Sequence, residues 1–209
     1  MNESSPSTRS LEGNGVGLVR EIALASRVQK ALEMLYRLDR AADVDDFMAA
    51  AEGDERETLF VREAEDGALE VRLRVPRLGA AEALDPICQI IEGVSHFVYL
   101  ADRAGRGREA TQLELEVQAE VDKYVVLAAS ITSFDERASR QLRDRLYESV
   151  SFAHGEDTVQ GERYRVANAC AKRFTARIER DFVARARFGE MHGALRAFFE
   201  MGQAAKLRG

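Results

Sequence analysis

Four side chains that could bind a metal ion fall at matching positions of two predicted helices. Glu92 and His96 are four residues apart and therefore share one face of their helix. Glu116 and Glu120 have the same spacing on the second helix. If the connection is centred near Arg106, antiparallel packing places Glu92 level with Glu120, and His96 level with Glu116. Carboxylates and an imidazole at one level suit a hard or borderline metal. The candidate metal ligands are thus Glu92, His96, Glu116 and Glu120.

The apolar residues of the first helix argue against this metal site. Glu92 and His96 fall nearly opposite its apolar face, within a polar stripe that is typical of a solvated surface. The Glu-x-x-His spacing of di-metal bundles is also absent. We therefore favour a solvated face and predict no cofactor. The alternative is a divalent metal bound by these residues, in a metal-binding helical bundle or a metal-dependent enzyme. The apolar face comprises Ile87, Ile90, Ile91, Val94, Phe97, Val98 and Ala101.

No other catalytic motif is complete. Ser95 and His96 are neighbours on a helix, where they point about 100° apart and are poorly placed for a Ser–His hydrogen bond. The sequence has no G-x-S-x-G elbow and no Walker lysine motif. Our leading hypothesis is a non-enzymatic interaction or regulatory protein that contacts a protein partner or a second copy of itself as a homodimer.

An arginine stripe raises the possibility of nucleic-acid binding. The four arginines recur at spacings of four, three and seven, which predicts one helix face that could contact phosphates. The net charge of −6 and the acidic segment 41–70 disfavour this interpretation. We expect that segment to supply the counter-charge, either within one chain or between subunits, and keep nucleic acid as the weaker alternative. The stripe comprises Arg173, Arg177, Arg180 and Arg187.

The hydrophobic periodicity predicts an α+β fold that is predominantly α-helical, a bundle of five or six helices with a long helical hairpin and one β-hairpin. Residues 113–121 alternate like a strand, but their Leu, Glu, Gln and Ala content favours helix. The β-hairpin, at about 57–75, must cover its apolar face with a helix or with another copy. Leu115 and Val126 lie away from the main apolar face of helix 109–130, so a second side of this helix should also be covered. We favour the C-terminal helices as the cover, with a dimer partner as the alternative. The predicted helices are about 18–38, 84–104, 109–130, 133–149, 161–186 and 190–206.

Length and composition indicate one domain. We expect a disordered tail at residues 1–16 and a single mainly helical domain at 17–209. Cys88 and Cys170 lie in apolar helical contexts, which is typical of free buried thiols. The chain has no apolar run long enough to cross a bilayer and no secretory signal pattern, so we expect no membrane partner and a cytoplasmic location.

Overall fold

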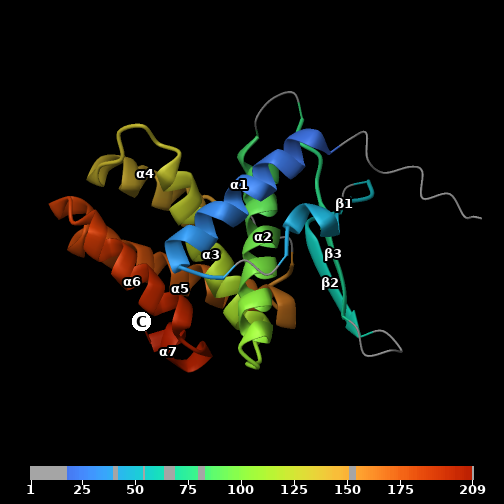
Figure 1. Cartoon of the computed structure of the whole chain (residues 1–209). Coiled ribbons are helices and arrows are strands. Elements are labelled where there is room, and N and C mark those ends of the chain that lie inside the picture. The colour runs from blue at the N-terminus through green and yellow to red at the C-terminus, as the bar shows by residue number, and fades with distance from the viewer. Residues whose placement is uncertain are drawn as a thin grey trace, which may run out of the picture.

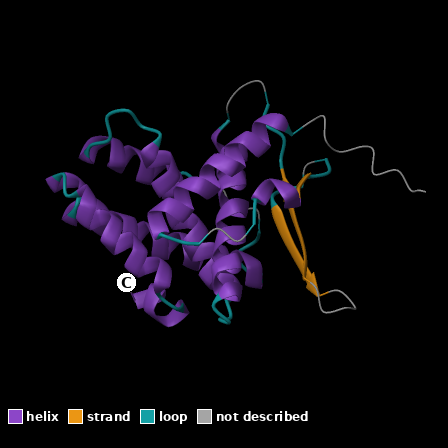
Figure 2. Cartoon of the chain, in the orientation of Figure 1, coloured by secondary structure: helices purple, strands orange, loops and turns teal. Residues whose placement is uncertain are grey.

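The computed structural model describes residues 18–39, 42–53, 55–63, 69–79, 83–150 and 154–208. This part of the chain contains seven α-helices and a small three-stranded sheet at one side of the molecule (Figures 1 and 2). The predominantly helical α+β fold that the sequence predicts is therefore confirmed. The expected tail at residues 1–16 lies outside the described residues.

The helices follow the predicted order with shifts of a few residues at their ends. Among the described residues, no helix is both long and apolar enough to cross a membrane. The helices are α1 (Val19–Tyr36), α2 (Leu84–Gly105), α3 (Gln112–Ala129), α4 (Glu136–Tyr147), α5 (Val159–Asp181), α6 (Phe188–Glu200) and α7 (Gln203–Arg208), with short 3₁₀ turns at Val44–Phe47 and Val183–Arg185.

The sheet has the order β1-β3-β2 (Met48–Ala50, Leu69–Val75 and Thr58–Glu63). β2 and β3 pair antiparallel with Leu59 opposite Leu73, whereas β1 runs parallel to β3. β1 is not predicted from the sequence, because a strand of three residues is too short to show an alternating pattern. Leu73 and Val75 are fully buried, and β2 and β3 pack on α2. The apolar face of the β-hairpin was expected to lie on a helix or on another copy of the chain, and in the structure it lies on the helix α2.

α2 lies at the centre of the molecule, between the sheet and the C-terminal helices (Figure 1). It contacts α1, α3, β2 and β3, and every residue from 89 to 99 is buried. Glu92 and His96 are each only 7% exposed. The prediction that these two residues lie on a solvated face is therefore wrong. A helical wheel identifies the most apolar face of a helix. It cannot show that other helices and strands also cover the polar face, as they do here.

α3 is a helix throughout the ambiguous segment 113–121, as predicted. It begins with a capping box in which Thr111 accepts from the backbone N–H of Glu114, while the Glu114 side chain accepts from that of Thr111. α5 packs along α3, which confirms the favoured cover by C-terminal helices. The predicted single helix at 190–206 is wrong, because the extended backbone at Met201 ends α6 and α7 starts at Gln203.

The short helix α7 places a lysine in the core. Lys206 is fully buried, and its ammonium donates to the Gln118 side-chain oxygen at 2.6 Å and to the Phe198 carbonyl at 2.8 Å. The same ammonium lies 4.3 Å from the centre of the Phe198 ring. Burial lowers the pKa of Lys206 from 10.5 to about 7, although Asp122 opposes this shift. The fold therefore disfavours the charged form of this lysine.

Replacing Lys206 by Met is expected to change how stability varies with pH. Between pH 7 and 10.5 the unfolded chain binds more protons at Lys206 than the folded chain does, so this group makes stability rise with pH. The slope is at most about 1.4 kcal/mol per pH unit. Urea unfolding at pH 7.5 and 9.0 should show Lys206→Met losing up to about 2 kcal/mol of the wild-type increase. The exposed Lys30→Met is the control and should behave like wild type; parallel curves for Lys206→Met and wild type would contradict the expectation.

Candidate metal centre

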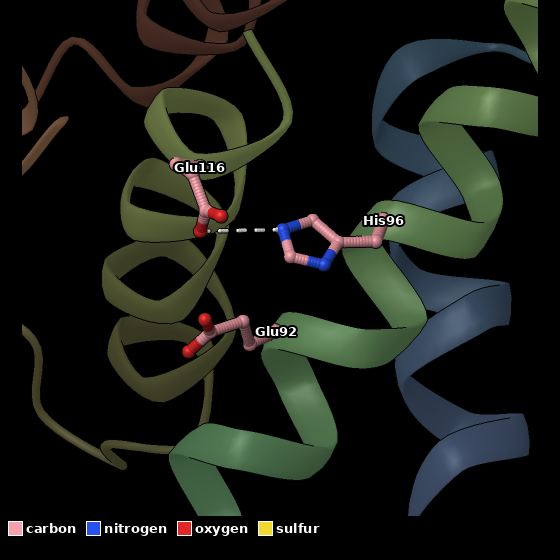
Figure 3. A group of neighbouring side chains, drawn as sticks. All are labelled: Glu92, His96 and Glu116. Atoms are coloured by element: carbon pink, nitrogen blue, oxygen red, sulfur yellow. Dashed lines mark ion pairs between the residues drawn. The ribbon is translucent and has the colours of Figure 1, made fainter. Parts of the chain in front are cut away.

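Three potential metal ligands point into the space between α2 and α3 (Figure 3). Glu92 and His96 come from α2, and Glu116 comes from α3. One donor atom of each lies within 4.8 Å of the donor atoms of the other two, and all three residues are buried. The pairing of His96 with Glu116 agrees with their predicted equal height. The structure therefore brings together three of the four candidate ligands in one group.

The imidazole of His96 lies between two carboxylates. Its Nε2 is 3.7 Å from Oε2 of Glu116, and its Nδ1 is 3.7 Å from Oε1 of Glu57. Within the described residues, Nε2 of His96 and Oε2 of Glu57 are buried atoms without a hydrogen-bond partner. The side chains of His96 and Glu57 are 9% and 8% exposed, respectively. A buried polar atom without a partner is costly, and the one that faces Glu116 is Nε2 of His96, which leaves this nitrogen able to bind a ligand.

The distances are close to those of a metal site. Two donors that bind one metal at about 2.1 Å in tetrahedral geometry lie about 3.4 Å apart. The 3.7 Å between His96 and Glu116 is only slightly longer. The donor atom of Glu92 lies within 4.8 Å of both, a gap that rotation of a glutamate side chain can close.

The fourth candidate, Glu120, lies beside this group and pairs with Lys123. The ammonium of Lys123 is 2.6 Å from Oε1 of Glu120 and 3.1 Å from Oε2 of Glu92. Arg163 of α5 lies with its Nε 3.5 Å from Oε1 of Glu116. α2 and α3 therefore carry facing rows of polar and charged side chains. Lys123 of α3 places a positive charge beside Glu92 and Glu120, and Arg163 of α5 places one beside Glu116.

Carboxyl groups outnumber cationic side chains in this cluster. The carboxyl groups of Glu57, Glu92, Glu116 and Glu120 lie near the cationic side chains of Lys123 and Arg163, and the charge of Arg56 also acts on Glu57 and Glu92. Burial and the charge of Glu92 raise the pKa of Glu116 to about 8. Burial and neighbouring carboxylates also raise the pKa of Glu57 and that of Glu120. The cluster therefore favours the neutral form of three of its four carboxyl groups, and a bound divalent cation would favour their ionised, metal-binding form.

The histidine is held in the form that binds metals. Burial lowers the pKa of His96 to about 4, despite the opposing charge of Glu92. Its imidazole is therefore neutral at physiological pH, as metal binding requires. Burial opposes ionisation of Glu92, but the charge of Lys123 and the hydrogen bond from its ammonium outweigh burial and lower the pKa of that carboxyl group. Glu92 is consequently the carboxylate of the group that is most readily ionised.

The group forms one wall of a cavity of about 570 Å³. Apolar side chains, including Leu59 and Leu115, line other parts of it, and the stacked rings of His154 and Tyr164 lie 5.6 Å apart at its wall. Val150, which is 41% exposed, lies at its rim and shows that the cavity opens to solvent. Its volume is in the range of small-molecule sites.

The arginine stripe is not one helix face. Arg173, Arg177 and Arg180 belong to α5, whereas Arg187 precedes α6. Arg180 pairs with Asp181, Arg187 pairs with Glu190, and Arg173 donates to the Leu207 carbonyl. Nearby groups of the C-terminal region therefore contact these three arginines, and the counter-charge expected from segment 41–70 stays a prediction.

Sequence reasoning missed three members of the cluster: Glu57, Lys123 and Arg163. Lys123 follows Glu120 by three residues on the same helix face, a spacing that could have indicated the ion pair. Glu57 precedes β2 in an irregular segment, and Arg163 lies on α5, which is far from α2 and α3 in the sequence. No local pattern identifies those two, because packing of separate elements brings them to the cluster.

Comparisons with protein-family models, with curated proteins and with solved structures gave no match to this chain.

Proposed function

We propose that this chain binds a divalent metal ion through Glu92, His96 and Glu116 and presents it to the adjacent cavity. The observation that carries the proposal is the buried Nε2 of His96, which lacks a hydrogen-bond partner among the described residues and faces a carboxylate at 3.7 Å. Three protein ligands leave a coordination position for water or a small molecule, which is typical of catalytic metal sites rather than structural ones. The open cavity supports this reading, since a bound ion would be accessible from solvent.

The donor set indicates a borderline metal. Imidazole favours ions such as Zn²⁺ and Fe²⁺, while carboxylates also accept Mn²⁺. In such a site Glu57 would hold the other ring nitrogen of His96, as carboxylates that hydrogen-bond to metal-bound histidines do in metalloproteins. Arg163 would similarly orient Glu116.

A non-enzymatic interaction or regulatory role is the second proposal. Its support from the sequence is the absence of a complete catalytic motif and the complementary charged segments, and the stripe of Glu92 and His96 that could have served as a contact surface is buried. Metal binding therefore takes precedence. The interaction role becomes the better proposal if the protein binds no metal.

Metal titration tests the proposed function. Protein made without a histidine tag and stripped with a chelator is titrated with Zn²⁺ and with Mn²⁺, and stoichiometry is read by native mass spectrometry and calorimetry. We expect one ion per chain for at least one of the two metals. At a free concentration of 100 times Kd, the ion should stabilise the fold by about 2.7 kcal/mol. No bound ion and no rise in melting temperature with either metal would disprove the proposal.

A further inference from the structure

Lys123 lies where two rows of metal-binding side chains face each other. On α2, Cys88, Glu92 and His96 follow at four-residue intervals and so share a face. On α3, Glu116, Glu120 and Lys123 form the opposing row. His96 and Glu116 make one level of this arrangement, and Glu92 and Glu120 make the next, with the Lys123 ammonium bonded to both carboxylates.

Glu92 belongs to both levels. Its Oε2 accepts a hydrogen bond from Lys123 at 3.1 Å, and one of its oxygens is within 4.8 Å of the donor atoms of His96 and Glu116. In two-metal sites, a pair of ions about 3.5–4 Å apart acts on one substrate, and carboxylates from facing helices supply their ligands. In this protein the ammonium of Lys123 lies between Glu92 and Glu120, where a second ion would lie in a two-metal site.

The ammonium is a permanent part of this centre. Lys123 is 8% exposed. Its Nζ lies 2.6 Å from Oε1 of Glu120 and 3.1 Å from Oε2 of Glu92, so it is held between the two side chains. Without the ammonium, the carboxylates of Glu92 and Glu120 would be left facing each other, and glutamate oxygens are among the ligands of Zn²⁺.

We propose that Lys123 is an internal cation that holds the second of two adjacent cation positions, so that the centre takes one divalent ion beside a fixed ammonium. This inference rests on the proposed metal binding at His96. The first position has His96, Glu116 and Glu92 as ligands, and the second is formed by Glu92 and Glu120. Removal of the lysine charge converts the centre to one that binds two ions.

The stoichiometry of Zn²⁺ binding tests the inference. Lys123→Met removes the charge and keeps most of the side-chain volume. Native mass spectrometry of the full chain should give one Zn²⁺ for wild type and two for Lys123→Met. Lys206→Met is the matched control, because it replaces another buried lysine that bonds to Gln118 and Phe198 instead. It should bind one ion.

The outcomes separate this inference from the proposed function. One ion in both wild type and Lys123→Met overturns the inference and leaves the metal site intact. No ion in wild type overturns both. If Lys123→Met does not fold, Glu120→Gln and Glu116→Gln are compared in the presence of Lys123. Glu116→Gln should weaken Zn²⁺ binding at least tenfold and Glu120→Gln less than threefold. Equal losses would overturn the inference.

Discussion

Replacing His96 by Ala is expected to lower the affinity for Zn²⁺ or Mn²⁺ by about 100-fold or more, since loss of a group that only hydrogen-bonds to a metal ligand already costs about 10–100-fold. His96 supplies the one nitrogen donor of the group, and its Nε2 faces Glu116 at 3.7 Å. Without it, the remaining carboxylates would have to hold the ion alone beside the positive charges of Lys123 and Arg163. Calorimetric titration of chelator-treated protein measures the change.

His192→Ala is the matched control for this experiment. His192 is exposed on α6 and should leave metal affinity unchanged when it is replaced. Circular dichroism and urea unfolding of the metal-free proteins distinguish a ligand from a structural residue. If His96 has only a structural role, His96→Ala will lower the free energy of unfolding, and the folded variant will bind the metal with the affinity of wild type. That result would remove His96 from the metal centre.

Replacing Gly93 by Ala is expected to destabilise the protein, although alanine normally favours a helix over glycine. A Cβ at this position would lie 2.6 Å from Cδ1 of Leu73 and 2.8 Å from Oε2 of Glu57. Overpacking of this kind costs about 1–3 kcal/mol. The higher helix propensity of alanine returns about 1 kcal/mol. The expected net loss is therefore up to about 2 kcal/mol.

Gly193→Ala is the same substitution at an open position of α6. Nothing lies within 4 Å of a Cβ built there, so this variant should gain up to about 1 kcal/mol of stability. Urea unfolding of both variants gives the comparison directly. Because Glu57 contacts the cluster from beside Gly93, Gly93→Ala should also weaken metal binding. Equal stability changes for the two variants would show that β3 and Glu57 do not pack tightly on α2.

Much of the secondary structure could be predicted from local sequence. The alternation of Leu69, Val71, Leu73 and Val75 predicted β3, and helix propensity correctly decided residues 113–121. The equal height of His96 and Glu116 also followed from residue numbers alone, because the rise per residue is the same in both helices. These features depend on backbone geometry and on side chains close in sequence.

The burial of the cluster was decided by tertiary structure. The sequence shows Glu92 and His96 opposite the most apolar face of α2, and from that position alone they should be solvated. The sheet, α1 and α3 surround α2, and irregular segment 55–57 brings Glu57 to His96. The sequence by itself thus determined which donors share a level along two helices. Only tertiary packing decided that they are buried, because burial depends on what covers a helix face and not on the residues of that face.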